Sequence, residues 1–337
     1  MKTVLILGAN GRFGQAAMQA FAAAGWRVLA QMRRAPVSAL PPGATALPVD
    51  LNDSATLAAQ ASGASVVLHA VNPVYTRWAA EALPALQQGL TVAQALGARF
   101  MLPGNVYNFG QQMPSVLKPT TEQHPSNNLG RIRVAMEEAL QARALQGLDS
   151  VVIRAGDFYG CGTGSWLDLV IAKDIAKDSA HGKLVYPGPL DVVHAWAYLP
   201  DLASAFVAVA SAPTPRGFQS LNFAGHALTG REFLAALQDA AQAQGLRPAA
   251  GFKTGGMPWG VIRAVGLVYP LWRELARMSY LWRVPHALDG TALAGAVAHL
   301  SSTPITQALR NALADLGHGA KPTPLLSTTE TLNRSFT

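Results

Sequence analysis

Residues 3–14 of the chain read TVLILGANGRFG, and this stretch decides the fold. Its first part, Thr3–Leu7, is an almost continuous apolar run, typical of a strand that is buried on both faces in a parallel sheet. Gly8, Gly11 and Gly14 follow at intervals of three, where the run gives way to an Ala-rich segment with helical spacing over residues 14–24. The stretch therefore predicts a strand, a tight turn and a helix in immediate succession.

The three glycines of this turn suit a bound phosphate group. In such turns the first glycine permits a tight bend, the second leaves the backbone open to a pyrophosphate, and the third lets the helix pack closely on the sheet. The start of the helix adds free N–H groups and the positive end of its dipole. A plain strand–helix turn is the alternative, but the strand before the glycines and the helix after them favour a dinucleotide-binding unit.

The same alternation of strand and helix patterns continues outward from this turn. It predicts an α/β fold, namely a Rossmann-type doubly wound parallel sheet with a smaller, mostly helical C-terminal substrate domain. The apolar runs that predict its strands are Thr3–Leu7, Arg27–Gln31, Ala46–Val49, Ser65–Ala70, Arg99–Leu102 and Ser150–Arg154. We assign residues 1–155 and 191–224 to the Rossmann domain, 156–190 and 225–320 to the substrate-binding region, and 321–337 to a polar tail.

Composition excludes several classes of protein. The chain has 337 residues, of which 50% are apolar and 13% charged, with a net charge of +7 and a single cysteine. This composition excludes disorder, a disulfide scaffold and a cysteine-based zinc site. No apolar run reaches membrane-spanning length, the N-terminus does not resemble a signal peptide, and the histidines are scattered, so we expect a cytoplasmic protein without a metal.

The end of the second predicted strand points to the cofactor. Residues 29–34 read LAQMRR, without the carboxylate that NAD-binding units usually place here for the ribose 2′-hydroxyl. Arg33 and Arg34 suit a 2′-phosphate instead, so we expect NADP, with NAD as the second candidate; two solvated surface arginines are the alternative interpretation. The expected cofactor contacts are Gly8, Asn10, Gly11, Arg12, Phe13, Gly14, Arg33, Arg34, Asp50, Leu51, Ala70, Val71 and Asn72.

Three later segments carry further patterns: residues 100–107 read FMLPGNVY, 152–160 read VIRAGDFYG and 194–203 read HAWAYLPDLA. Together with the glycine turn, and in this order, they resemble the extended short-chain dehydrogenase/reductase family, which includes NAD-dependent epimerases and dehydratases. The resemblance spans about residues 1–230. It implies a nicotinamide cofactor and a substrate held by the region that follows the Rossmann strands.

The chain departs from that family at the residues that carry its chemistry. The family uses a Ser together with Tyr-x-x-x-Lys, in which the Tyr moves a proton and the Lys lowers its pKa and holds the nicotinamide ribose. Here Leu129 stands in the Tyr place, Arg133 in the Lys place, and Pro103 or Gly104 in the Ser place. Arg133 can hold the ribose and supply positive charge, but it cannot carry a proton at neutral pH. The resemblance therefore implies an atypical member.

Residues at the carboxyl ends of the predicted strands are candidates to replace the missing chemistry, because the cleft of such sheets lies there. Tyr107 and Tyr159 are candidate proton carriers, with Arg133 as the third catalytic candidate, since burial or a nearby arginine can tune the pKa of a phenol. A packed aromatic side chain with a hydrogen bond is the alternative for either tyrosine. The expected substrate contacts are Tyr75, Asn105 and Asp157.

Residues 257–283 form an apolar, aromatic and basic segment that we expect to be helical, with a kink near Pro270. Packing against the Rossmann domain, or covering a pocket, is the favoured interpretation. An oligomer contact and a membrane surface are the alternatives. Its aromatic and arginine side chains include Trp259, Tyr269, Trp272, Tyr280, Trp282, Arg263, Arg273, Arg277 and Arg283.

These patterns together predict an NAD(P)-dependent oxidoreductase or epimerase-like enzyme that prefers NADP and acts on a small, anionic or sugar-like substrate. A catalytically silent NADP(H)-binding sensor or regulatory protein is the alternative, supported by the loss of the whole Ser and Tyr-x-x-x-Lys set. We expect a monomer or homodimer, with neither nucleic acid nor a membrane as partner.

Overall fold

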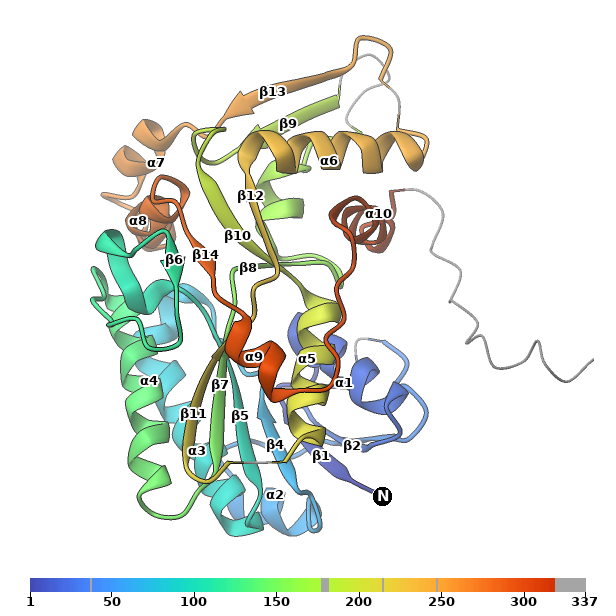
Figure 1. The fold of residues 1–337 in the computed structure, drawn as a ribbon, viewed down its shortest axis with the longest axis vertical. Coiled ribbons are helices and arrows are strands. Elements are labelled where there is room, and N and C mark those ends of the chain that lie inside the picture. Colours follow the sequence, from blue (N-terminus) through green and yellow to red (C-terminus); the bar gives the residue numbers. More distant parts are fainter. Residues whose placement is uncertain (37, 177–181, 214, 247, 319–337) are drawn as a thin grey trace, which may run out of the picture.

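The computed structural model describes residues 1–36, 38–176, 182–213, 215–246 and 248–318, so the tail expected at 321–337 lies outside the described residues. Its main element is a seven-stranded parallel sheet in the order β11-β7-β5-β4-β1-β2-β3 (Figure 1). This arrangement confirms the predicted Rossmann-type sheet. The strands are β1 (Thr3–Leu7), β2 (Arg27–Gln31), β3 (Ala44–Leu47), β4 (Val66–His69), β5 (Arg99–Gly104), β7 (Ser150–Arg154) and β11 (Phe218–Asn222).

Helices bury both faces of this sheet, as β1 illustrates. Val4 and Ile6 belong to one apolar core with α1 and α5, whereas Leu5 and Leu7 belong to another with α2, α3 and α4. Because both faces are covered, every residue of β1 is buried, which explains the continuous apolar run in the sequence. The helices are α1 (Arg12–Ala23), α2 (Ser54–Gln60), α3 (Trp78–Leu96), α4 (Asn128–Ala144) and α5 (Leu199–Ser211).

The position of β1 determines where a ligand can bind. This strand lies between β2 and β4, so the chain moves outward from it in both directions. Open α/β sheets bind their ligands at such a switch point, beyond the carboxyl ends of the strands. The ends of β1, β4 and β5 therefore lie at the edge of the sheet where a ligand is expected.

A smaller region lies above the large sheet in the view of Figure 1. It contains a three-stranded sheet in the order β12-β10-β8 and a two-stranded pairing of β13 with β9. From the sequence we placed residues 191–224 in the Rossmann domain. Within this range, β10 pairs with β8 and β12 instead of joining the large sheet. The elements of the smaller region include β8 (Asp157–Tyr159), β9 (Gly182–Tyr186), β10 (Val193–Tyr198), β12 (His226–Thr229), α6 (Gly230–Ala243), β13 (Phe252–Gly256) and α10 (Ile305–Asp315).

The basic aromatic segment forms two helices rather than one kinked helix. They are α7 (Trp259–Val265) and α8 (Pro270–Arg277), and the 3-10 helix η4 (Met278–Trp282) follows. Gly266 ends α7, and Pro270 occupies the first turn of α8, where a proline is favoured. A Cβ on Gly266 would lie 3.0 Å from backbone atoms of Arg273, so the two helices meet closely. We refer to residues 259–277 as the α7–α8 hairpin.

Shorter elements connect these parts of the fold. In the described ranges, no helix has both the length and the apolar character needed to cross a membrane. The short elements are η1 (Tyr75–Arg77), η2 (Tyr107–Gln112), β6 (Val116–Leu117), η3 (Leu167–Ile171), β14 (Ala287–Leu288) and α9 (Thr291–Ala296).

Candidate active site

The turn between β1 and α1 has the geometry that a dinucleotide phosphate requires. Gly8 adopts a φ of +74°, and a Cβ there would lie 3.0 Å from the backbone of Val71. A Cβ on Gly14 would lie 2.6 Å from the carbonyl oxygen of Gly8. Gly11 precedes α1 without a side-chain cap, so the first N–H groups of the helix are open to a phosphate. The residues present therefore fit a pyrophosphate.

Gln31 occupies the end of β2, where an acidic ribose-binding residue usually stands. Its buried amide accepts a hydrogen bond from the Gly8 N–H at 3.0 Å and donates to the carbonyl of Val49 at 2.8 Å, so the oxygen braces the turn and the nitrogen holds the segment after β3. Arg33 and Arg34 beyond it are exposed. The Asn10 amide donates to the carbonyl of Arg34 at 3.3 Å, which holds the segment with both guanidinium groups beside the phosphate turn.

The other expected cofactor contacts lie in different surroundings at the edge of the sheet where the strands end. Asp50 is exposed, and its carboxylate accepts a hydrogen bond at 2.8 Å from the backbone N–H two residues later. Leu51 and Ala70 are buried, whereas Asn72 is exposed. Val71 lies directly against the phosphate turn. Their contact with a cofactor stays a prediction.

Arg12 uses its side chain to fasten α1 to residues 158–164. Its guanidinium donates to the carbonyl oxygens of Gly160 at 2.8 Å and Gly164 at 3.2 Å. Phe13, the next residue, is buried with its ring centroid 5.1 Å from that of Phe206. The first turn of α1 is thus bound to the segment that begins the smaller region.

Two tyrosines meet beyond the carboxyl ends of β4 and β5. Tyr75 lies in η1, Tyr107 begins η2, and their hydroxyl oxygens are 2.8 Å apart. The side chain of Asn105 accepts a hydrogen bond from the Tyr107 N–H at 3.0 Å and so fixes the start of η2. Tyr107 is buried and Tyr75 is partly exposed, so Tyr75 is the more accessible member of the pair.

The surroundings of the pair favour the protonated phenols. Burial raises the pKa of Tyr107 well above its usual range, and Tyr75 and Asp157 add to this effect. Burial also raises the pKa of Tyr75, although the hydrogen bond from Tyr107 and the charge of Arg133 act in the opposite direction. Both hydroxyls therefore keep their protons at neutral pH, as a proton donor must.

Arg133 of α4 lies beside this pair. Its guanidinium donates to the carbonyl of Pro103 at 3.1 Å and lies 4.7 Å from the centre of the Trp78 ring. Burial lowers its pKa and the nearby tyrosines oppose that change, but a guanidinium stays charged at neutral pH. Arg133 therefore supplies a fixed positive charge next to two neutral phenols.

The places where the resembled family has its Tyr and Ser hold apolar side chains. Leu129 is 2% exposed and belongs to the same apolar core as Tyr107. Pro103 lies near the end of β5. Neither side chain can donate or accept a proton, so chemistry at this site has to use the neighbouring tyrosines.

Asp157, expected to contact the substrate, is paired within the protein. Its carboxylate lies 2.9 Å from Nε2 of His194, and the imidazole of His194 stacks on Trp282 with ring centres 4.2 Å apart. The Asp157 side chain keeps 15% of its surface exposed. This pairing orients the carboxylate at the border between the two regions.

The structure does not bring Tyr159 to this group. Its hydroxyl lies 3.0 Å from Nδ1 of His226, and its ring is fully buried in an apolar core with Trp196 and Phe233. Burial raises the pKa of Tyr159. These are the surroundings of the packed, hydrogen-bonded aromatic that was the alternative interpretation.

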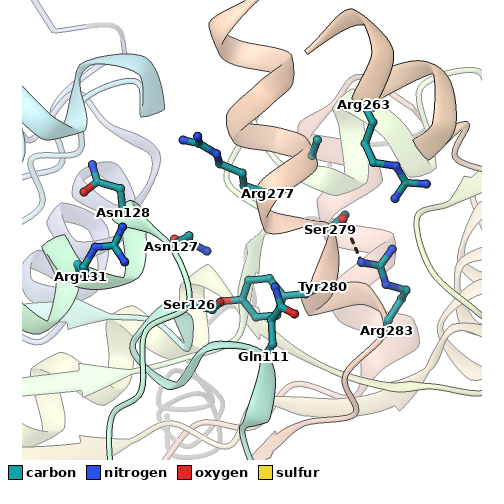
Figure 2. Close-up of a pocket in the computed structure, with 11 residues that line it drawn as sticks. Gln111, Ser126, Asn127, Asn128, Arg131, Arg263, Arg277, Ser279, Tyr280 and Arg283 are labelled. Carbon is teal, nitrogen blue, oxygen red and sulfur yellow. Dashed lines mark hydrogen bonds between the residues drawn. The ribbon is translucent and has the colours of Figure 1, made fainter. Parts of the chain in front are cut away.

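Sequence reasoning missed a cavity, shown in Figure 2, between the start of α4 and the α7–α8 hairpin. Four arginines line it, and the basic character of residues 257–283 was the only signal for it in the sequence. In all the residues that the structure describes, no group of three or more His, Cys, Asp or Glu side chains is arranged to bind a metal ion.

Comparisons with known proteins agree on the fold. The family model of the NAD dependent epimerase/dehydratase family matches residues 4–222. The UDP-Glc/GlcNAc 4-epimerase of Campylobacter jejuni is 14% identical with a TM-score of 0.70, covering 94% of this chain and 99% of that one. L-threonine 3-dehydrogenase of Trypanosoma brucei is 19% identical with a TM-score of 0.69, covering 95% and 99%.

A third solved structure, MoeE5 in complex with UDP-glucose and NAD, is 19% identical with a TM-score of 0.67, covering 93% of this chain and 98% of that one. A comparison with curated protein sequences finds no match. At these identities the solved structures support the fold, and the family model supports the family.

Proposed function

The chain belongs to the NAD dependent epimerase/dehydratase family, and we propose that it is an NADP-dependent oxidoreductase that reduces a carbonyl group on a small, anionic or sugar-like substrate. The observation that carries this proposal is the 2.8 Å contact between the hydroxyls of Tyr75 and Tyr107. The pair lies at the strand ends where the nicotinamide half of a dinucleotide binds in this fold. It offers the proton donor that Leu129 cannot supply.

The cofactor assignment rests on the phosphate turn and on the segment after β2. Glycine geometry around Gly8 and Gly14 admits the pyrophosphate, and Gln31 is occupied in bracing the turn. Arg33 and Arg34 are exposed beside that turn, where guanidinium groups can grip a 2′-phosphate. When bound, the reduced nicotinamide would supply the hydride that the carbonyl carbon of the substrate receives.

Tyr75 is the proton donor of this mechanism. It gives its hydroxyl proton to the carbonyl oxygen as negative charge develops there, and its raised pKa keeps the proton in place until then. Tyr107 donates a hydrogen bond to the oxygen of Tyr75 and so stabilises the phenolate left behind. Arg133 stabilises the same phenolate through its charge and holds the nicotinamide ribose.

The substrate side is assigned to residues that border the pair. Asn105 fixes the backbone that carries Tyr107, and Asp157 presents its remaining oxygen at the edge of the smaller region. Both can accept hydrogen bonds from substrate hydroxyl groups. We assign Tyr159 no catalytic role in this mechanism.

A catalytically silent NADP(H)-binding sensor is the second candidate function, and the burial of Leu129 favours it. A protein that only senses the dinucleotide needs the phosphate turn but no proton donor. The bond between Arg12 and residues 158–164 would then pass cofactor occupancy to the smaller region.

The two candidates differ in what Tyr75→Phe does. With NADPH and a panel of aldehydes, ketones and keto acids, we expect turnover that this variant lowers by about 10²–10⁴-fold, the usual contribution of a proton donor. The dissociation constant for NADPH should not change. Tyr159→Phe is the matched control and should keep its turnover. NADPH that binds but is oxidised by no member of the panel would favour the sensor.

The remaining expectations belong to the same proposal. We propose a cytoplasmic protein that acts as a monomer or homodimer, and light scattering of the purified chain, with and without NADPH, tests the oligomeric state.

A further inference from the structure

The cavity lined by four arginines, which we call the arginine cavity, has a volume of about 420 Å³, within the range of small-molecule pockets. Figure 2 shows its two sides: residues 126–131 at the start of α4, and residues 263–283 of the α7–α8 hairpin and η4. Arg131, Arg263, Arg277 and Arg283 line it from both sides, and among the described residues that line it none is acidic. The cavity therefore concentrates positive charge.

Where the structure is described, only one of these four arginines has an acidic partner. Arg277 forms an ion pair with Glu274 at 2.7 Å. Arg131, Arg263 and Arg283 have no carboxylate within ion-pair distance in the described ranges, and Arg283 donates only to the hydroxyl of Ser279 at 3.3 Å. Cations gathered in this way repel one another, and a bound anion removes that cost.

Uncharged donors add to the same cavity. Asn127 caps α4, accepting a hydrogen bond from the backbone N–H of Gly130 at 3.0 Å, so the positive end of this 17-residue helix faces the cavity. Tyr280 also lines the cavity, is 2% exposed, and its hydroxyl interacts with the side chains of Ser126 and Asn127 on the opposite side.

An apolar surface adjoins the arginines. Eleven large apolar side chains are exposed in the described chain, and six of them lie in the α7–α8 hairpin. Such a concentration marks a binding surface more often than chance exposure. Trp272 precedes the cavity-lining Ala276 by one helical turn, on the same side of α8. The six side chains are Val261, Leu267, Val268, Tyr269, Leu271 and Trp272.

We propose that the cavity binds the phosphoryl group of an amphiphilic phosphate, whose apolar part lies along the exposed face of the α7–α8 hairpin. Four guanidinium groups exceed what a single carboxylate neutralises, whereas a phosphate offers more charge and more acceptor oxygens to their N–H groups. A second copy of the chain would bring the same arginines face to face, so charge disfavours it as the occupant. That this ligand is the substrate rests on the proposed function; its binding does not require the dinucleotide.

The first experiment compares three soluble probes by calorimetry with NADP⁺ in excess, so that a probe phosphate does not occupy the turn between β1 and α1: pyrophosphate, monomeric dodecyl phosphate and uncharged dodecyl maltoside. We expect dodecyl phosphate to bind at least tenfold more tightly than pyrophosphate, and dodecyl maltoside to bind weakest. Equal affinity for the two phosphates, or tighter binding of the uncharged probe, would overturn the proposal.

Variants separate the two halves of the site. Arg131→Gln and Arg283→Gln should each weaken both phosphates at least tenfold. Trp272→Ser should weaken dodecyl phosphate alone. Glu274→Gln removes the competing carboxylate beside Arg277 and should strengthen pyrophosphate binding a few-fold, which a merely structural role would not produce. Arg27→Gln, an exposed arginine on β2, is the matched control. Equal effects of Arg27→Gln and Arg283→Gln would contradict the site.

A second measurement distinguishes the source of the ligand. Flotation with vesicles of phosphatidylcholine alone, and with added phosphatidylglycerol, tests a lipid headgroup against a soluble phosphate ester. Binding to the anionic vesicles that Trp272→Ser abolishes assigns the ligand to a lipid, and binding of dodecyl phosphate without vesicle binding assigns it to a soluble ester; either supports the site. An NADPH titration that stays unchanged in these variants separates failure here from failure of the cofactor assignment.

Discussion

Two regions of the molecule are built to meet negative charge, and they use different means. The turn between β1 and α1 presents backbone N–H groups, and its glycines make room for a phosphate. The cavity beside α4 presents guanidinium groups from side chains that are far apart in the sequence. A site made of backbone is encoded in one short stretch, whereas a site made of side chains depends on how distant segments pack. The predictions below test this difference, beginning with the largest expected effect.

The first prediction concerns the attachment of α4, whose first turn borders the arginine cavity. Glu137 of α4 forms a buried ion pair with Arg154 of β7, with contacts of 2.6 and 2.9 Å, and also accepts from Asn108 and Gln123. Glu137→Leu leaves a buried, unpaired guanidinium and should lower the free energy of unfolding by about 3–5 kcal/mol in urea. The exposed neighbour Glu138, changed to Leu, should lower it by less than about 1 kcal/mol; similar losses would refute the role of the pair.

The second prediction tests the backbone site. In Gly14→Ala the new Cβ meets backbone atoms of Gly8 and Ala9 at 2.6–2.9 Å, and backbone cannot move aside as a flexible side chain can. We expect NADPH binding to weaken by at least about 100-fold, or about 2.7 kcal/mol, in a fluorescence titration. Gly260→Ala in α7 is the control, because a Cβ there meets nothing within 4 Å. Unchanged NADPH binding in Gly14→Ala would mean that the phosphate lies elsewhere.

The third prediction uses two buried histidines outside both sites, His69 at the end of β4 and His286 just before β14. Burial lowers the pKa of His69, at the end of β4, to about 3, with a contribution from Arg133, and that of His286 to about 4, with a contribution from His194. Both are neutral in the folded chain, while the unfolded chain takes up their protons below about pH 6.5. Stability should therefore fall as the pH drops from about 6.5 towards 3, by roughly 1.4 kcal/mol per pH unit for each histidine.

The control for this pH dependence is the removal of one titrating group at a time. His69→Leu should reduce the acid slope by about one proton, measured by denaturant unfolding at several pH values. His286→Leu should do the same down to about pH 4. If both variants lose stability with falling pH as steeply as the parent, then folding keeps neither histidine neutral.

The smallest effect on dinucleotide binding is expected at Arg33, a side chain beside the turn between β1 and α1. Arg33→Gln removes one of the two charges that we propose for a 2′-phosphate, and we expect NADPH to bind about tenfold more weakly while NADH is unaffected. The exposed Arg27 at the other end of β2 is the matched position. Equal losses for the two dinucleotides would remove the case for NADP.

The strands of the large sheet and the glycine turn were predictable because short, continuous stretches of sequence encode them. The runs 3–7, 27–31 and 150–154 became β1, β2 and β7 without a change of boundary, since the central residues of a strand that is covered on both faces are apolar. The run 46–49 was displaced by two residues, to Ala44–Leu47, because an edge strand such as β3 is partly exposed and its apolar signal is weaker.

The smaller region was less predictable because its strands pair over long distances. β10 was not among the six predicted strand runs, and it pairs with β8 and with β12, which lies beyond α5 in the sequence. β9 and β13 pair across more than sixty residues, and β13 is mostly polar or glycine and largely exposed, so no apolar run indicates this pairing.

The candidate site divides in the same way. The glycine turn and the candidacy of Tyr107 followed from their positions after strands. The contact between Tyr75 and Tyr107, and the meeting of Arg131 with Arg263, Arg277 and Arg283, depend on how separate segments fold together. Composition showed that residues 257–283 are basic, but only packing places that charge opposite the start of α4.

The fastening of α1 to residues 158–164 by Arg12 has a consequence for protein engineering. The segment that follows β8 is anchored by a side chain about 150 positions earlier in the sequence, through the carbonyls of Gly160 and Gly164. Grafting that segment onto a related scaffold to alter specificity would leave its anchor behind. A successful transplant has to carry position 12 with it, so the unit of exchange is a pair of distant segments rather than one loop.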